Sequence, residues 1–294
     1  MRRVILACLL LTSLTGCTGL FFQPMKNLVR TPADIGLAYE DVDFSSKDGV
    51  PLHGWFLPAR DAKGTVLFLH GNAQNISTHI GSVFWLPEQG YNVFLPDYRG
   101  YGRSGGVPTL DGVQRDIDAA MRHLLSRPDV DRDRIVLFGQ SLGGALAVFY
   151  AARGPERRHF RAVIIDSAFS GYRDIAREKL DILWWTRWLK WPAGFTVDDD
   201  FSPIRVAGEI GPVPKLFMVG GRDAVVPGHH GRRLFDAAQS PKEMWEFPDA
   251  DHIAALAKPE ARTRLMDWIG RVLREGEVGY IGKADGSSVG PVTR

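Results

Sequence analysis

A five-residue sequence, G-Q-S-L-G at residues 139–143, limits the possible folds of this chain more than any other feature. The apolar run 135–138 comes directly before it, and a second apolar stretch, 144–152, directly follows. A G-x-S-x-G sequence between a strand and a helix is typical of a sharp turn that exposes its serine at the carboxyl edge of a sheet. The two glycines leave space where a Cβ would clash. An ordinary Gly/Ser turn is the alternative, and the flanking strand and helix disfavour it.

Unbroken apolar runs of strand length recur along the chain. Such runs are typical of parallel strands that are covered on both faces. They lie at residues 65–69, 92–96, 135–138, 162–165, 215–219 and 242–247. The segments 113–125 and 265–273 carry apolar residues at helical spacing. This alternation predicts an α/β fold with a mostly parallel central sheet and helices on both faces.

The sheet is expected to begin with antiparallel strands. Residues 39–45 alternate between apolar and polar side chains, and residues 52–57 form a second apolar-rich segment. A Lys-Asp-Gly turn signal at 47–49 separates the two. Two short strands around such a turn predict an N-terminal β-hairpin.

Two polar residues, each of which follows a later apolar run, are expected to act together with Ser141. A serine hydroxyl is a weak nucleophile unless a base takes its proton and a carboxylate orients that base. Asp223 follows the run 215–219, and His252 follows the run 242–247. Because the carboxyl ends of parallel strands meet at one edge of a sheet, we expect both side chains beside Ser141. The pattern predicts Ser141 as nucleophile, His252 as general base and then acid, and Asp223 as the orienting carboxylate.

Other acids and histidines compete for these roles. Asp249 and Asp251 are close to His252 in sequence, but they share its short loop and are expected to form turns there. His229 and His230 begin a later helix, and we expect both side chains to be exposed.

Attack by Ser141 on a carbonyl group requires two backbone N–H donors that hold the developing negative charge on oxygen. Leu142, the residue after the serine, is expected to supply one. The second is expected from the H-G-N-A sequence after the first parallel strand. Its best candidate is the N–H of Asn72, because the preceding glycine permits a close approach, and Ala73 is the second choice.

The N-terminus has the composition of a bacterial export signal. Two arginines precede the apolar run 4–14, which is too short to span a bilayer as a helix. The sequence L-T-G-C that ends at Cys17 resembles the lipobox of bacterial lipoproteins. This resemblance implies a signal peptide at 1–16, acylation of Cys17, and an anchored linker at 17–38. An ordinary secretory signal with a chance cysteine is the alternative.

The same resemblance implies where the protein resides. Several acyl chains on one cysteine bind firmly to a membrane, which makes the membrane an expected partner. Thr18 stands where an aspartate would direct a lipoprotein away from the outer membrane. We therefore expect a location in the bacterial cell envelope, on the periplasmic side of the outer membrane more than on the inner membrane.

Charge and cysteine content exclude other classes of protein. The chain has 36 basic and 34 acidic residues, and loss of the two arginines in the signal makes these numbers equal. No basic stripe indicates a nucleic-acid partner. Cys8 lies in the signal, so only Cys17 remains and no disulfide is expected. A chain of 294 residues that is 45% hydrophobic is long enough to be stabilised by a large core.

A segment at 169–203 interrupts the alternation of strands and helices. Its first half has a helical pattern and contains Trp184, Trp185, Trp188 and Trp191. Because it lies between two expected sheet strands, we predict a small cap over the site. The tryptophans are expected to line an apolar acyl pocket or to touch lipid, and simple packing against the domain is the open alternative.

These motifs together resemble those of the α/β-hydrolase superfamily of serine hydrolases. The resemblance covers residues 39–275, which gives the expected hydrolase domain. The chain is similar to the membrane-associated branch of this superfamily, which includes acyl-protein thioesterases and serine aminopeptidase-like proteins. Its motifs lie at residues 70–73, 97–104, 139–144, 221–227 and 251–252. The resemblance implies the roles given above for Ser141, Asp223 and His252, and a non-catalytic, site-shaping loop at 97–104.

The function expected from the sequence is hydrolysis of an ester or thioester of a small or acylated substrate through an acyl-enzyme. We expect no metal and no organic cofactor. A serine peptidase or amidase of the same fold is the first alternative, and a non-catalytic envelope lipoprotein that binds a ligand is the second. Residues 276–294 are rich in Gly and Ser and are expected to form a mobile tail.

Overall fold

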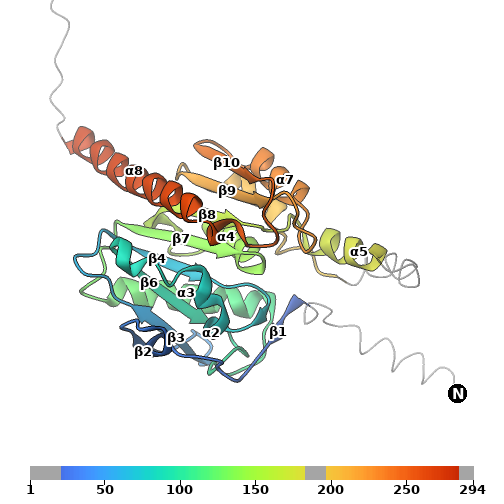
Figure 1. Ribbon diagram of the computed structural model, residues 1–294, viewed down its shortest axis with the longest axis horizontal. Coiled ribbons are helices and arrows are strands. Elements are labelled where there is room, and N and C mark those ends of the chain that lie inside the picture. Colours follow the sequence, from blue (N-terminus) through green and yellow to red (C-terminus); the bar gives the residue numbers. More distant parts are fainter. Residues whose placement is uncertain (1–20, 183–196, 285–294) are drawn as a thin grey trace, which may run out of the picture.

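The computed structural model describes residues 21–182 and 197–284. An eight-stranded sheet forms its centre, with the strand order β10-β9-β8-β7-β4-β6-β3-β2 (Figure 1). The strands of this sheet are β2 (Glu40–Ser45), β3 (Pro51–Leu57), β4 (Gly64–Leu69), β6 (Tyr91–Asp97), β7 (Ile135–Gln140), β8 (Phe160–Asp166), β9 (Lys215–Gly220) and β10 (Lys242–Phe247). A separate two-stranded sheet pairs β1 (Gln23–Pro24) with β5 (Ala73–Gln74).

Strand pairing agrees with the sequence-based expectation. All neighbours from β10 to β6 pair in parallel. Strand β3 pairs antiparallel with both β6 and β2, which forms the predicted N-terminal hairpin. The prediction of an α/β-hydrolase fold with a mostly parallel sheet is therefore confirmed. The carboxyl ends of β4, β7, β8, β9 and β10 lie along one edge, which we call the carboxyl edge.

Helices cover both faces of the sheet. The α-helices are α2 (Ile76–His79), α3 (Leu110–Ser126), α4 (Leu142–Arg153), α5 (Tyr172–Ile182), α7 (His229–Ala237) and α8 (Pro259–Ala284). Short 3-10 helices are η2 (Pro32–Ile35), η3 (Ile80–Ser82), η4 (Pro87–Gln89), η5 (Arg157–His159), η7 (Pro203–Arg205), η8 (Ala207–Glu209) and η9 (Ala255–Ala257). Helix α3 begins after Thr109, whose hydroxyl accepts a hydrogen bond from the N–H of Gly112.

Alternating side chains along the strands divide the interior into two cores. On β4, Leu67 and Leu69 pack into one core, and Val66 and Phe68 pack into the other. Helices α3, α4 and α7 contribute to the first core, whereas α8 and the α2–η3 segment contribute to the second. Because β4 is buried on both faces, its sequence is a continuous apolar run, as expected for a central parallel strand.

The limits of the folded domain differ from those expected at both ends. Residues 17–38 were expected to form a linker, but Phe22 is 5% exposed in the first core and β1 belongs to a sheet. Helix α8 continues to Ala284, past the expected domain end at 275. Backbone hydrogen bonding propagates readily from helical turns that are already packed, and this extends the helix beyond its apolar face. The predicted signal peptide, Cys17 and residues 285–294 lie outside the described residues.

No helix within residues 21–182 and 197–284 combines the length and the apolar character needed to cross a bilayer.

Candidate functional site

Ser141 occupies a strained turn between β7 and α4. Its backbone angles are φ +55° and ψ −118°, and its N–H donates a 2.8 Å hydrogen bond to the carbonyl of Asp166. A Cβ at Gly143 would collide with the carbonyl oxygen of Leu69, and a Cβ at Gly139 would collide with the backbone of Gly143. Only glycine therefore fits at either end of this turn. The result is the geometry expected for the G-x-S-x-G sequence, with the serine at the start of a helix.

Asp223 and His252 form a hydrogen-bonded pair at the same edge of the sheet. His252 Nδ1 lies 2.7 Å from Asp223 Oδ2, and Asp223 Oδ1 accepts hydrogen bonds from the N–H groups of Val225 and Val226 at 2.9 and 2.7 Å. The carboxylate side chain is 1% exposed and the imidazole 17% exposed. With its Nδ1 proton donated to Asp223, a neutral His252 has its lone pair on Nε2, which is the state required of a general base.

The end of β8 joins the loops of Ser141 and His252. Asp166 accepts the Ser141 N–H, and the hydroxyl of the next residue, Ser167, accepts the Ile253 N–H at 3.3 Å. Burial raises the pKa of the Asp166 carboxyl to about 6, although Gln140 Nε2 and Ser167 Oγ both donate to it. Sequence analysis missed this pair of residues. The available signal was a polar residue that directly ends the buried run 162–165.

The loop after β4 lies against the nucleophile. A methyl group placed on Gly71 would lie 3.7 Å from the Cβ of Ser141. His70 Nδ1 binds the Gly71 carbonyl at 2.8 Å, and the Tyr101 hydroxyl donates to the Asn72 carbonyl at 2.6 Å. Because the C=O and N–H of a trans peptide point in opposite directions, these bonds direct the N–H groups of Asn72 and Ala73 away from the buried side chains.

Buried polar groups contact the loop after β4 from the interior of the protein. His70 is fully buried, and burial lowers the pKa of its imidazole well below the usual value. Asp97, at the end of β6, accepts the Ile76 N–H at 3.0 Å and lies 3.5 Å from His70 Nε2. Burial raises the pKa of the Asp97 carboxyl to about 7. Tyr98 donates to the His70 carbonyl at 3.0 Å, so the 97–104 loop contributes to the shape of this edge.

The competing acids near His252 are occupied or exposed. Asp249 pairs with Arg222 at 2.9 Å, and both side chains are largely exposed. Asp251 is also exposed. The structure thus brings His252 together with Asp223 and leaves the two nearby aspartates in solvent.

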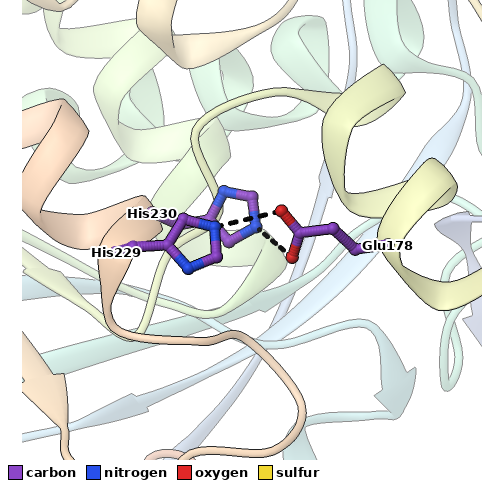
Figure 2. A group of neighbouring side chains, drawn as sticks. All are labelled: Glu178, His229 and His230. Atoms are coloured by element: carbon purple, nitrogen blue, oxygen red, sulfur yellow. Dashed lines mark hydrogen bonds and ion pairs between the residues drawn. The ribbon is translucent and has the colours of Figure 1, made fainter. Parts of the chain in front are cut away.

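His229 and His230 do not match the expectation that both are exposed. His230 is fully buried, whereas His229 is half exposed. Both histidines contact Glu178 of α5, at 3.0 Å from His229 Nε2 and 3.1 Å from His230 Nε2 (Figure 2). The prediction of exposure was wrong for His230 because helix α5 covers it, and a helix from a distant segment leaves no local pattern in the sequence.

The ligand atoms of Glu178, His229 and His230 lie within 4.8 Å of one another, close enough to hold a metal ion. The backbone N–H of Ser170 donates to His230 Nδ1 at 3.2 Å. This bond keeps the lone pair of the neutral ring on Nδ1 and its proton on Nε2, where a metal would have to bind. The proton instead forms the hydrogen bond to Glu178. The cluster therefore fits a set of hydrogen bonds that joins α5 to α7, and we call these three residues the latch.

Helix α5 is the part of the predicted cap that the structure describes. Lys179 on this helix donates to the carbonyl of Ala224 at 3.0 Å, next to Asp223. The cap segment therefore reaches the loop of the candidate carboxylate. Trp184, Trp185, Trp188 and Trp191, on which the expected acyl pocket depends, lie outside the described residues.

Comparison with known proteins agrees with this fold. The family model described as serine aminopeptidase, S33, matches residues 60–199. An uncharacterized protein of Escherichia coli K12, YfhR, is 38% identical over 238 residues, which cover 78% of this chain and 80% of YfhR. The Arabidopsis thaliana protein WAV2, described as an alpha/beta hydrolase domain-containing protein, is 37% identical over 240 residues, or 78% of this chain and 77% of WAV2.

A solved structure of an esterase has the same architecture. The Pyrococcus furiosus esterase Pf2001 superposes with a TM-score of 0.69 and 25% sequence identity, over 86% of this chain and 98% of the esterase. This chain belongs to the α/β-hydrolase family, in the group that contains the YfhR proteins.

Proposed function

We propose that this protein is a serine hydrolase that cleaves an ester or thioester through an acyl-enzyme. The observation that carries the proposal is the buried 2.7 Å bond between His252 and Asp223, at the sheet edge where Ser141 stands in a strained turn. A hydrolase family and an esterase structure among the similar proteins support the same reaction class.

The proposed reaction uses only groups of this chain and water. Ser141 Oγ attacks the carbonyl carbon while its proton passes to His252 Nε2, and Asp223 stabilises the resulting imidazolium. The N–H groups of Leu142 and Asn72 bind the oxyanion. The intermediate collapses, the C–O or C–S bond to the leaving group breaks, and His252 returns the proton to that group. Water, activated by His252, then hydrolyses the acyl-enzyme and restores the serine hydroxyl.

An ester or thioester substrate is favoured over a peptide by the contacts of the three aspartates at 198–200, near the end of the predicted cap segment. Aminopeptidase activity would require a free carboxylate to bind the substrate amine. Asp199 accepts the Arg173 N–H at 3.1 Å and lies 3.7 Å from Arg205. Asp200 also faces Arg205, at 3.8 Å, and Asp198 accepts the Asp200 N–H. All three carboxylates thus already have partners. The name of the family model keeps the peptidase as the alternative.

We further propose that acylated Cys17 anchors the protein in the bacterial envelope, with the carboxyl edge toward the membrane. Support comes from Gln23, a few residues after Cys17, which pairs with β5 in the loop next to Ser141. Val107 and Val225 lie in loops after β6 and β9 and expose 76% and 48% of their surfaces. A short anchor and apolar side chains at one edge suit a substrate with a membrane-borne acyl group.

The first test is labelling of the full chain with a fluorophosphonate, which reacts with activated serines. We expect Ser141→Ala and His252→Ala to abolish labelling. Asp223→Asn should lower ester turnover by about 10⁴-fold, because the imidazole loses its orienting carboxylate. Asp249→Asn, a matched change in an exposed carboxylate of the same edge, should retain the parent rate. A folded parent that is not labelled would refute the proposed chemistry.

The substrate class and the anchor need separate measurements. Acyl esters and acyl thioesters should be hydrolysed faster than aminoacyl arylamides, and amide cleavage without ester cleavage would reverse this ranking. Cys17→Ser should move the protein from the membrane fraction to the soluble fraction and abolish incorporation of a labelled fatty acid. Unchanged fractionation of Cys17→Ser would refute the anchor.

A further inference from the structure

The first described residues run beside the loop that carries Asn72. We call residues 21–29 the N-terminal strap and residues 70–75 the oxyanion loop. In the strap, β1 pairs in parallel with β5 of the oxyanion loop, so that Gln23 lies opposite Ala73. Figure 1 places β1 at the same end of the molecule as α5. The strap therefore belongs to the surroundings of the site, although the hydrolase domain was expected to begin well after it.

The strap contacts the residue that we propose as an oxyanion donor. The N–H of Gln23 donates to Asn72 Oδ1 at 2.9 Å, and the Tyr101 hydroxyl donates to the Asn72 carbonyl oxygen at 2.6 Å. Tyr101 thus holds Asn72 at its backbone carbonyl, and Gln23 holds it at its side-chain oxygen. The N–H of Met25 donates to the Gln74 carbonyl at 3.1 Å, where Gln74 has φ +73°. A non-glycine residue in this region requires support from its surroundings.

The strap is itself firmly attached to the body of the protein. Phe22 packs in the core, and the ring of Phe21 meets the ring of Tyr172 edge-on at 5.0 Å. Lys26 Nζ donates to the Ser104 carbonyl at 2.7 Å. Asn75 Nδ2 donates to the carbonyls of Met25 and residue 27, both at 2.9 Å. Because the strap is attached both to the body of the protein and to the oxyanion loop, it holds that loop in a fixed position.

We propose that the N-terminal strap positions the Asn72 N–H for oxyanion binding, and that Gln23 and Asn75 are its main positioning residues. The inference rests on the proposed serine-hydrolase function. Ala73 and Gln74 are exposed, so the pairing with β1 and the bond of His79 to the Ala73 carbonyl at 2.9 Å are what hold the outer part of the loop. An oxyanion donor acts only at the correct distance from the developing charge, so a loosened loop lowers kcat more than it changes substrate binding.

The test compares matched variants of the full chain in detergent. Gln23→Pro removes the N–H that binds Asn72, whereas Gln23→Ala keeps that N–H and changes only an exposed side chain. Asn75→Asp removes the two donors to the strap but keeps the oxygen that caps α2 through the Ser77 N–H. Asn27→Asp makes the same chemical change at an exposed strap residue. For each variant, kcat and KM on an acyl ester are measured, and active sites are counted by prolonged fluorophosphonate labelling.

We expect Gln23→Pro and Asn75→Asp to lower kcat about ten-fold relative to their matched variants, with KM within two-fold and full labelling. Full loss of one oxyanion donor costs about 10²–10³ in kcat, and a displaced donor should cost less. A purely structural defect would instead reduce the fraction of sites that can be labelled. If Gln23→Pro fails to fold, the comparison of Asn75→Asp with Asn27→Asp decides.

The outcomes distinguish failure of the strap proposal from failure of the proposed serine-hydrolase function. A parent that is neither labelled nor active overturns the serine-hydrolase function and the strap proposal with it. An active parent whose fully labelled Gln23→Pro and Asn75→Asp variants have kcat within two-fold of their matched variants overturns the strap proposal alone.

Discussion

Replacement of Ser141 by glycine is expected to stabilise this protein, whereas the same change at an ordinary position would destabilise it. Ser141 has φ +55° and ψ −118°. A residue with a Cβ enters this region at a cost of about 1–3 kcal/mol. The cost persists because the N–H of Ser141 is bound to Asp166 and because glycine positions 139 and 143 pack against backbone on both sides.

The size of the effect follows from two opposing terms. Glycine removes the strain at the Cβ but loses about 0.5–1 kcal/mol more chain entropy on folding than alanine does. Ser141→Gly should therefore be about 1 kcal/mol more stable than Ser141→Ala. Both variants lack the hydroxyl, so their difference isolates the Cβ. In a protein of this size, about 1 kcal/mol corresponds to a shift in Tm of about 2–4 °C.

The assay is urea and thermal unfolding of the two variants side by side. Ser126 in α3 provides the control, because its backbone is helical. There, at the last residue of α3, the glycine variant should be less stable than the alanine variant by at most about 0.5–1 kcal/mol. If Ser141→Gly is less stable than Ser141→Ala, the turn holds no strain, and the argument that it presents an exposed nucleophile fails.

Two further predictions concern buried groups near the site. Burial raises the pKa of Asp97 to about 7, so the native state binds a proton more tightly than the unfolded chain, and stability is lost as pH rises from about 4 through about 7. Asp97→Asn keeps an acceptor for the Ile76 N–H and stays neutral at all pH values. Urea unfolding should therefore show a smaller loss of stability between pH 5 and pH 8 in this variant than in the parent. Equal losses of stability in the two proteins would contradict this prediction. Glu178→Ala leaves the buried Nε2 proton of His230 without a partner and should cost about 1–3 kcal/mol, with faster hydrogen exchange in α5. Glu178→Gln, which keeps an acceptor, should cost less, and a rise in the Tm of the parent on addition of zinc would refute the latch.

The sheet could be predicted from the sequence because strands that are buried on both faces consist of continuous apolar runs. Strands β4, β6, β7, β8 and β9 of the central sheet each contain an apolar run that was identified beforehand, and the structure extends these runs by only one to three residues. The pairing of Asp223 with His252 was also expected, since the topology of parallel strands delivers both residues to one edge.

Features that depend on distant pairing could not be predicted in the same way. A two-residue strand such as β1 is too short for any periodicity, and its partner β5 lies far away in sequence. The burial of His230 depends on α5, and the bridging role of Asp166 and Ser167 depends on loops from two other strands. In each case the local sequence is compatible with an exposed turn, and only tertiary contact determines the outcome.

The distribution of backbone strain supports the location of the site without reference to any relative. Five non-glycine residues have positive φ among those the structure describes, and four of them lie at the carboxyl edge. They are Gln74, Ser141, Ser167 and Ile253. Ser141 is the candidate nucleophile, and Ile253 follows the candidate base. Ser167 accepts the Ile253 N–H, and Gln74 lies in the loop of the candidate oxyanion donor.

Strain of this kind persists only where the surroundings hold it, and it clusters where a precise arrangement is required. The strands of the sheet hold Ser141 and Ser167 through backbone bonds to their neighbours, whereas Gln74 depends on the strap. Of these four positions, Ser141 and Ser167 are thus held from the sheet, Ile253 is held by the Ser167 hydroxyl, and Gln74 is held by the N-terminal strap. If the strap carries the membrane anchor, the support of the oxyanion loop and the attachment to the bilayer are functions of one continuous segment. An activity that differs between membrane-bound protein and its Cys17→Ser variant, at equal active-site number, is the consequence expected of that arrangement.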